Sequence, residues 1–523
     1  MVVPLLVAAT LVVFTIFYRK LRYIRFRQYA HIPQHPTSLL LGHLKLFGEF
    51  MKRNKPNAHA DLAIVSMNRA LGRPPLMFID MRPINDPMVV VGDHEIADQL
   101  TKASKIFPTS PPKSSRSLER LLYLTGQTSI FSQHNEEWKL LRKRFSPGFA
   151  PQYLITFVPE ILDKGLIFLE RLDSLSKTED TFSLMSLTTR LTFDVIGKVV
   201  METDLDAQYY DQGKIGELVD LFETLLDAYN GERFNLPWWL TIRKVRRRAA
   251  LSNRITSLLQ AIVRHKHADL HETGKNTVNA RSVLSLGLQD IATLTPDIVD
   301  ETCDQLRTFL FAGHDTTSIL LSWVFYELSR TPHALRAVHA ELNNLLGPDS
   351  SPATVRARLL ERVDLVQQMP YISAVITTTT PTGRHRACDT AGFWLHRSII
   401  HTDPKAYGDT ADDFVPERWL ADDNSDAVGQ TAIPASAWRP FERGPRNCIG
   451  QELANIEARV IIALAVRRYD FIKVGLGEFA LDEGGRPKLD TKKGQYKVTE
   501  ELYTTRQVTS KPVDGMKMRV KVV

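Results

Sequence analysis

The sequence predicts a mainly helical α+β fold that follows an N-terminal membrane helix. Apolar residues recur at helical spacing over most of residues 182–276, and a second long helical segment spans residues 295–329. Two short β-prone segments, residues 76–80 and 88–91, flank a turn rich in Pro, Asn and Asp and indicate a small N-terminal sheet. Of the 523 residues, 43% are apolar and 24% are charged, which is typical of a globular protein with a large core.

The formal net charge of the chain is +7. This net charge is either ordinary surface charge or an adaptation to a membrane surface or an acidic protein partner. Because no recognised nucleic-acid-binding motif accompanies the charge, the sequence predicts no nucleic-acid partner.

Residues 1–18 form an uncharged apolar run that is followed at once by Arg19, Lys20 and Arg22. A helix over this run is about 27 Å long, close to the ~30 Å hydrocarbon core of a bilayer. The alternative is a cleaved signal peptide, which has its positive charges before the apolar run and a small-residue site after it. We therefore expect residues 1–18 to be an uncleaved transmembrane anchor, with the protein body on the cytosolic side.

The segment after the anchor, residues 19–45, is first basic and then rich in proline, so we expect a stiff hinge. The body is expected to be one domain over residues 46–523. Within it, Asp93 is predicted to cap a short helix and residues 108–117 to form a loop. Near the C-terminus, Tyr469 begins a predicted strand, and Asp514-Gly515 is a turn signal.

A helix with an acidic first turn is predicted to begin at Asn135, which is expected to cap it. Trp138 and Arg142 are four residues apart, so they lie on the same face of this helix. By itself, such a pair usually means a packed tryptophan beside a solvated arginine.

Trp238 and Trp239 precede a basic run, residues 243–248, between two amphipathic segments. The headgroup region of a bilayer suits this combination. A core-packed tryptophan pair beside a solvated helix face suits it equally, so the sequence leaves both interpretations open.

The helix over residues 295–329 has a clear start, because Thr295 is a capping residue and Pro296 occupies the first helical position. Its interior contains Ala312-Gly313-His314-Asp315-Thr316-Thr317. A glycine, an acid and two hydroxyls inside a helix are unfavourable unless they serve a purpose, and the hydroxyls can bond back to carbonyls and bend the helix. A hydroxyl-rich packing seam is the structural alternative.

The most informative segment is Phe441-Glu442-Arg443-Gly444-Pro445-Arg446-Asn447-Cys448-Ile449-Gly450. The chain has only 3 cysteines, so neither a disulfide framework nor a Cys-rich zinc site is predicted. Cys448 precedes an apolar helix predicted over residues 452–467, and the amides at its N-terminus are expected to lower the pKa of the thiol. A buried structural cysteine is the alternative.

The order F-x-x-G-x-R-x-C-x-G resembles the haem-binding loop of the cytochrome P450 family and matches it at every fixed position. The resemblance implies a haem-thiolate fold in which Cys448 is the axial ligand of the iron of haem b. It further implies that Arg446 binds a haem propionate. Phe441 is expected to shield the sulfur, and Gly450 to let the flat macrocycle approach the backbone.

Two further motifs resemble those of the same family. Trp138 and Arg142 match its W-x-x-x-R pair, which implies that both side chains reach a haem propionate. Asp315 and Thr316 match the acid and first threonine of its A-G-x-[DE]-T-T motif, which implies that they deliver protons during oxygen activation.

A fourth family motif is altered. The family carries an E-x-x-R helix whose Glu and Arg lock onto the Arg of a later P-E-R segment, here Arg418. Where K-E-T-x-R is expected, the sequence reads Thr377-Thr378-Thr379-Thr380-Pro381. Threonine and proline are poor helix formers, so the sequence predicts that this helix and the strands after it are missing and that Arg418 lacks its usual partners. Either a conceptual translation with a mis-joined exon or a deletion, or a degenerate paralogue, explains the alteration.

The resemblance implies a monooxygenase that inserts one oxygen atom from O2 into an apolar organic substrate. Electrons would come from NADPH through NADPH–cytochrome P450 reductase, at the endoplasmic reticulum membrane. The cysteine loop and the C-terminal tail look like those of fungal members that tailor secondary metabolites. A catalytically impaired paralogue, or a mis-spliced gene product, is the main alternative. A haem-thiolate isomerase or dehydratase is a second one, although it would not need Asp315 and Thr316.

Overall fold

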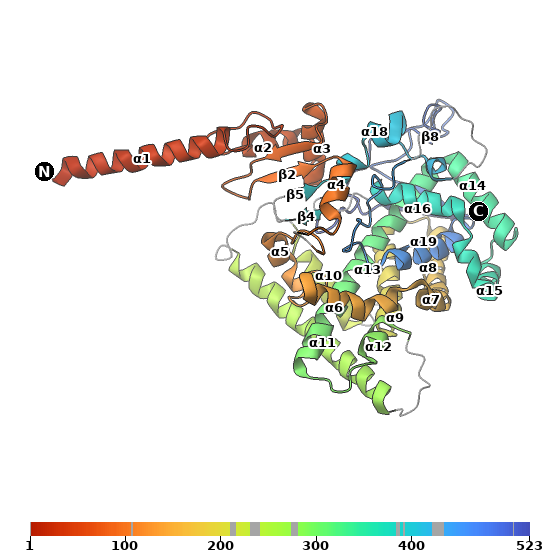
Figure 1. The fold of residues 1–523 in the computed structure, drawn as a ribbon. Coiled ribbons are helices and arrows are strands. Elements are labelled where there is room, and N and C mark those ends of the chain that lie inside the picture. Colours follow the sequence, from red (N-terminus) through yellow and green to blue (C-terminus); the bar gives the residue numbers. More distant parts are fainter. Residues whose placement is uncertain are drawn as a thin grey trace.

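The N-terminal helix α1 (Val2–Phe26) projects from the rest of the protein (Figure 1). The computed structural model describes residues 2–105, 108–209, 216–230, 241–272, 281–382, 388–390, 393–420, 433–505 and 507–523. Residues Val3–Phe26 are long and apolar enough to cross a membrane, and none of their most apolar window is buried. This agrees with the predicted anchor, although the helix continues past Tyr18.

The C-terminal end of α1 is tied to the body by the buried side chain of Arg25. Its guanidinium lies 2.6 Å from the carboxylate of Asp80 and donates to the carbonyls of Leu39 and Leu40. Gly42 makes this close approach possible, because a Cβ there would lie 2.6 Å from the guanidinium and its φ is +55°. The anchor therefore enters the body as a continuous helix.

A four-stranded sheet lies close to the anchor, in strand order β1-β2-β5-β4. The two predicted strands are present as β1 (Leu76–Ile79) and β2 (Met88–Val91), which pair antiparallel. The others are β4 (Cys388–Thr390) and β5 (Phe393–Leu395), and β5 runs parallel to β2. Beside the sheet are α2 (Leu44–Arg53), α3 (Ala60–Ala70) and α4 (His94–Thr101). Asp93 caps α4 as predicted, because its carboxylate accepts two first-turn amides.

Helices make up most of the body. Those before the long central helix are α5 (Ser115–Thr125), α6 (Asn135–Phe145), α7 (Pro151–Leu154), α8 (Val158–Thr178), α9 (Leu184–Met201), α10 (Glu217–Asp227), α11 (Ile242–Glu272) and α12 (Val283–Leu288). The central helix is α13 (Pro296–Arg330), capped by Thr295 as predicted. After it come α14 (Pro332–Leu346), α15 (Pro352–Glu361), α16 (Pro370–Thr382), α17 (Arg397–Ile400), α18 (Pro404–Tyr407) and α19 (Gln451–Ala465).

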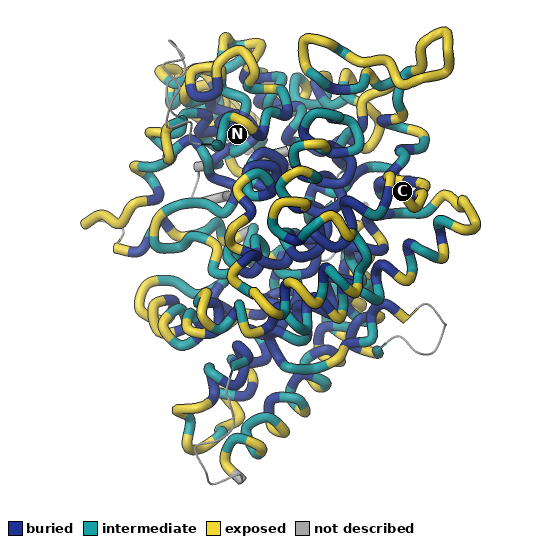
Figure 2. The backbone as a smooth tube through the Cα atoms, turned by 90° about the vertical axis from the view of Figure 1, so that its right-hand side faces the viewer, coloured by how far each residue is buried: buried dark blue, intermediate teal, exposed yellow. Residues whose placement is uncertain are grey.

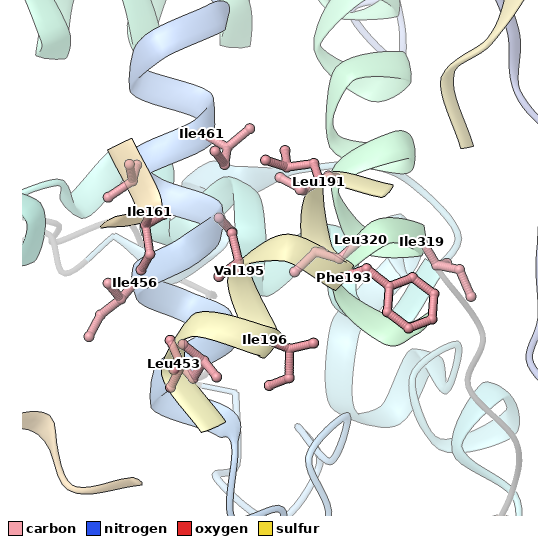
Figure 3. Close-up of a cluster of buried hydrophobic side chains, with 14 of the residues drawn as sticks. Ile161, Leu191, Phe193, Val195, Ile196, Ile319, Leu320, Leu453, Ile456 and Ile461 are labelled. Atoms are coloured by element: carbon pink, nitrogen blue, oxygen red, sulfur yellow. The ribbon is translucent and has the colours of Figure 1, made fainter. Parts of the chain in front are cut away.

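The main core lies where α8, α9, α13 and α19 meet (Figure 3). Leu191 and Val195 of α9, Leu320 of α13 and Ile456 of α19 are among its fully or almost fully buried side chains. Figure 2 shows this buried interior in the middle of the body, with exposed residues at its periphery. The core holds α13 and α19 next to each other, and these two helices carry or adjoin the predicted catalytic and ligand motifs.

Two local predictions were wrong in detail. The loop predicted over residues 108–117 ends before Ser115, where α5 begins. The capping position of α6 is His134 rather than Asn135, whose φ is +48°. Both boundaries differ by only a few residues, because chain direction at a helix start depends on tertiary contacts as well as on capping preference.

The helix that the threonine run was predicted to abolish is present as α16. The carboxylate of Glu341 accepts the amides of Tyr371 and Ile372 and so caps the first turn. The hydroxyls of all four threonines then donate to the carbonyls four residues earlier, and Thr378, Thr379 and Thr380 are buried. Burial of one face and these internal hydrogen bonds outweigh the low helix propensity, which is a weak preference. The strands after the helix are also present, as β4 and β5.

The C-terminal part closes the body. A three-stranded antiparallel sheet has the order β3-β9-β6, formed by β3 (Phe182–Ser183), β6 (Tyr469–Lys473) and β9 (Lys517–Val522). A small hairpin consists of β7 (Leu489–Asp490) and β8 (Gln495–Tyr496). The predicted strand at Tyr469 is therefore confirmed. The turn at Asp514-Gly515 is confirmed as well, with Gly515 at a φ of +69°.

Candidate functional site

The loop before α19 is a tight turn that presents Cys448. The amide of Cys448 donates to the carbonyl of Phe441 at 2.8 Å, which closes the loop. Gly444 has a φ of +84°, and a Cβ on it would lie 2.2 Å from the carbonyl oxygen of Thr101. Glycine is therefore required at this position, and the turn directs the chain so that Cys448 stays exposed.

The protonation of Cys448 differs from the prediction. Although Cys448 as a residue is exposed, the protein atoms around its sulfur desolvate the thiolate and raise the pKa of the thiol, and the amide of Gly450 and the charges of Arg142 and Arg397 lower it only in part. The expected net lowering was wrong for the protein by itself, because desolvation of a thiolate outweighs the helix N-terminus.

Two arginines converge on this loop. Arg142 of α6 donates to the backbone carbonyl of Asn447 at 2.9 Å and to its side-chain oxygen at 3.0 Å. Arg446 donates to the carbonyls of Ile130 and Gln133, and its guanidinium lies 5.2 Å from the ring centre of Trp138. The W-x-x-x-R pair and the cysteine loop therefore lie together, as predicted.

The residues at this loop fit a haem group. A Cβ at position 450 would meet its nearest neighbour, the ring of Phe149, only at 4.0 Å, so the protein leaves space directly beside Gly450. Burial lowers the pKa of Arg142, which makes no ion pair with any described carboxylate and so suits an acidic group on a ligand. Cys303 is less suited to bind a metal, because burial raises the pKa of its thiol to about 12.

Asp315 and Thr316 lie on α13 but face different surroundings. The hydroxyl of Thr316 is half-exposed and donates to the carbonyl of Ala312 at 2.7 Å, and Ala312 is itself exposed. Asp315 is only 1% exposed at its side chain. The next residue toward the N-terminus, His314, stacks on Phe193 at 3.7 Å, and burial lowers its pKa to about 4. Thr316 therefore faces accessible space, while Asp315 faces the protein interior.

The partners of Asp315 come from the C-terminal segment. The ammonium of Lys511 lies 2.6 Å from one carboxylate oxygen, and the hydroxyl of Thr509 donates to the other. Burial opposes ionisation of Asp315, but Lys511, His314 and Thr509 more than offset it, so that its pKa is lowered. Sequence analysis missed Lys511 and Thr509, because no local pattern marks a contact made across the fold.

The region of the altered motif is held together differently from the expectation. Thr378 and Pro381 of α16 stand at the expected positions of the Glu and the Arg. Arg418 of η6 (Pro416–Trp419) is half-buried and donates to the carbonyls of Thr410, Asp413 and Val415. Among the residues that the structure describes, no carboxylate pairs with Arg418, so its charge is stabilised by carbonyl dipoles.

The sequence leaves two interpretations open for the tryptophan pair at 238–239 and the basic run over residues 243–248. Trp238 and Trp239 lie outside the described residues. Of the basic run after them, Arg243, Lys244, Arg246 and Arg247 are exposed on α11, whereas Arg248 is buried and donates to the carbonyl of Ala228.

Comparison with known families gives one match that covers most of the chain. The family model described as "Cytochrome P450" matches residues 43–379 and 394–497. The interruption between these ranges coincides with the altered motif and the residues after it.

Relatives and a solved structure agree with this match. Cytochrome P450 monooxygenase acrF of Aspergillus aculeatus is 29% identical, over 88% of this chain and 97% of its own length. Cytochrome P450 monooxygenase polC of Polytolypa hystricis is 25% identical, over 90% of this chain and 87% of its own. A crystal structure of the cytochrome P450DA heme domain aligns with a TM-score of 0.69 and 18% identity, covering 94% of this chain and 97% of that one.

Proposed function

Because this chain belongs to the cytochrome P450 family, we propose that it is a membrane-anchored monooxygenase that inserts one oxygen atom of O2 into an apolar organic substrate. The observation that supports this proposal is the loop that contains the exposed Cys448 and Arg446, with Arg142 and Trp138 of α6 in contact with it. The relatives acrF and polC are themselves monooxygenases by name.

The cofactor in this proposal is haem b. Cys448 would supply the thiolate that binds its iron, and Trp138, Arg142 and Arg446 would hold its propionates. Phe441 would shield the sulfur from water, and Gly450 would leave room for the macrocycle. When bound, the haem supplies a thiolate-ligated iron that activates O2.

Asp315 and Thr316 are the proposed proton-delivery pair. The hydroxyl of Thr316, half-exposed on α13, can hold a proton next to the accessible space. The carboxylate of Asp315 is buried against Lys511 and Thr509, so it can exchange protons only through these two side chains. Lys511 is 21% exposed at its side chain and so joins this buried acid to solvent. General acid catalysis by such a pair contributes on the order of 10²–10⁴-fold to a rate.

The proposed electron donor is NADPH–cytochrome P450 reductase. A relative from Gibberella moniliformis, 29% identical over 54% of this chain, is named as a fusion of a P450 with such a reductase. Lys139 and Lys143 are exposed on α6, the helix that contacts the cysteine loop through Arg142. These charges suit an acidic partner surface, and they would steer its approach more than they would add to its affinity.

The proposed location is the endoplasmic reticulum membrane, with a single span and a cytosolic catalytic domain. The apolar helix α1 and the exposed positive residues Arg19, Lys20, Arg22 and Arg27 after its apolar part support this orientation. The substrate class that we propose is a fungal secondary metabolite, because acrF and polC are fungal enzymes.

Incubation with isotopically labelled O2 tests this function. Membranes containing the full chain, the reductase and NADPH are given a panel of apolar metabolites, and products are analysed by mass spectrometry. We expect one labelled oxygen atom in the product and none with the Cys448→Ala variant. Turnover without label and without NADPH would instead indicate an isomerase or dehydratase.

A second candidate function rests on one observation, the presence of Thr378 and Pro381 where the family has Glu and Arg. In this alternative the chain is a membrane-bound paralogue that incorporates no haem. The same membranes would then contain the folded chain without bound haem.

A further inference from the structure

The carbonyl of Thr377 in helix α16 has no backbone amide to accept at the usual position four residues later. In an α-helix each carbonyl accepts the amide four residues later, and the residue four after Thr377 is Pro381, which has no amide hydrogen. The indole N–H of Trp438 donates to the carbonyl of Thr377 at 3.1 Å. The proline at the expected Arg position thus leaves an acceptor open, and a side chain from just before the cysteine loop occupies it.

We propose that Trp438 is a positioning residue that fastens the cysteine loop to α16 in place of the charged Glu/Arg lock. This inference rests on the proposed function insofar as the loop is held in place in order to ligate haem. It assigns a role to the altered motif itself: the change that removes the arginine also creates the site at which Trp438 binds.

The contact continues from Trp438 to the ligand loop. Its ring lies 5.9 Å from the ring of Phe441, measured between centres. The carbonyl of Phe441 in turn accepts the amide of Cys448 at 2.8 Å. Three successive contacts therefore connect the backbone of α16 to the residue that carries the sulfur.

The same tryptophan also reaches the P-E-R segment. Its ring makes an edge contact with Trp419 of η6 at 6.3 Å, and Trp419 makes another with Tyr407 at 6.3 Å. Independently, the hydroxyl of Tyr371 on α16 donates to the carboxylate of Glu417 on η6. Trp438 thus joins α16, η6 and the cysteine loop, and Tyr371 adds a second link between α16 and η6.

This fastening needs no buried ion pair. Arg418 lies over the ring of Tyr407 at 5.7 Å and donates to backbone carbonyls, so its charge has partners without a glutamate from α16. Replacing a buried charged network by neutral contacts is often neutral for stability, whereas leaving half of such a network is costly. The chain has lost both the Glu and the Arg, which is the combination that avoids this cost.

Hydrogen exchange of the full-length chain tests the fastening directly. The variant Trp438→Phe keeps a ring but removes the donor, and Trp419→Phe is a matched control because the indole nitrogen of Trp419 is buried and bonds no described atom. We expect amides of residues 438–450 to exchange about fivefold faster in Trp438→Phe, the effect of one lost hydrogen bond, and to be unchanged in Trp419→Phe. Equal exchange in the two variants would overturn the inference.

A second variant covers the case in which Trp438→Phe does not fold. Pro381→Ala restores an amide that competes with Trp438 for the carbonyl of Thr377. If Trp438 did not fasten the loop, Pro381→Ala should be harmless or stabilising, since alanine favours a helix. The fastening predicts faster exchange over residues 438–450 and, in the reduced carbon monoxide complex, a smaller fraction of the red-shifted thiolate band. Unchanged exchange and an unchanged fraction would contradict it.

The two readouts separate the two proposals. If the wild-type chain shows no red-shifted band, the proposed function fails, while hydrogen exchange still decides whether Trp438 fastens the loop. If the band is present and Trp438→Phe exchanges like Trp419→Phe, the fastening fails and the proposed function stands.

Discussion

Helices α13 and α16 meet in the same core but satisfy their polar groups in opposite ways. On α13, the buried Asp315 remains ionised because Lys511 of the C-terminal segment supplies a counter-charge at 2.6 Å. On α16, the places expected for a charged pair hold Thr378 and Pro381, and the threonine hydroxyl bonds within its own helix. On α13 a buried charge is therefore kept by a counter-charge from another segment, whereas on α16 neutral contacts take the place of a charged pair.

The largest effect on this comparison is expected from Lys511→Met. Removing the ammonium leaves Asp315 buried without its counter-charge, which costs about 3 kcal/mol, the low end for a broken buried pair, because the carboxyl can take up a proton. Urea unfolding of the purified chain measures this loss, with Lys511→Arg as the control that keeps the charge. A loss equally large in a background that already carries Asp315→Asn would contradict a direct pairing.

The same pair predicts a pH dependence with a definite sign. Because the folded-state pKa of Asp315 is lowered, the ion pair stabilises the protein above the ordinary carboxyl pKa, and this stabilisation is lost as pH falls through the folded-state pKa. In Lys511→Met the pKa of Asp315 rises, so this acid-dependent loss is absent from the variant and the stability difference between the two proteins narrows as the pH falls. Thermal unfolding as a function of pH checks this, and parallel profiles for the two proteins would contradict it.

A smaller effect is expected on turnover from Asp315→Asn. The amide has nearly the same shape but cannot take up or release a proton as a carboxyl group does, so under the proposed proton-delivery role product formation per NADPH consumed should fall on the order of 10²-fold. The measurement is product yield against NADPH oxidation in reconstituted membranes. A normal yield would remove Asp315 from the proposed proton pathway, whatever the outcome for Lys511.

Arg418→Leu tests whether the charge of Arg418, near α16, is stabilised by carbonyl groups without a carboxylate partner. Its hydrogen bonds run to carbonyls, so the loss in unfolding free energy should be about 1.5–3 kcal/mol, as for hydrogen bonds of a charged group, rather than that of a broken buried ion pair. Urea unfolding measures it. A much larger loss would reveal an acidic partner for Arg418 that the described residues do not include.

The smallest effect is expected from Thr378→Val. The two side chains have the same shape, and the hydroxyl that is lost bonds only to the carbonyl of Ala374 in the same helix. The change in unfolding free energy should stay below about 1 kcal/mol. A larger loss would mean that Thr378 has a tertiary polar contact and replaces the family's glutamate more directly than we propose.

Local features of this protein could be predicted from its sequence. The caps at Asp93 and Thr295, the strands β1, β2 and β6 and the turn at Gly515 follow from short-range patterns, and the structure has each of them. The grouping of Arg142, Arg446 and Cys448 followed from a family resemblance rather than from spacing.

What could not be predicted depends on contacts across the fold. Helix α16 forms through a threonine run because burial and the capping carboxylate of Glu341 override propensity. The pairing of Asp315 with Lys511 and the contact of Trp438 with α16 join segments far apart in the chain. The pKa of Cys448 was expected to fall, but desolvation, which depends on the packed structure, raises it.

The most direct test of this account is a reduced carbon monoxide difference spectrum of membranes that contain the full-length chain. We expect a red-shifted Soret band, which would show that thiolate-ligated haem forms although Thr378 and Pro381 replace the Glu and the Arg. Folded chain with no band, or only the unshifted band of a protonated or lost thiolate, would contradict it.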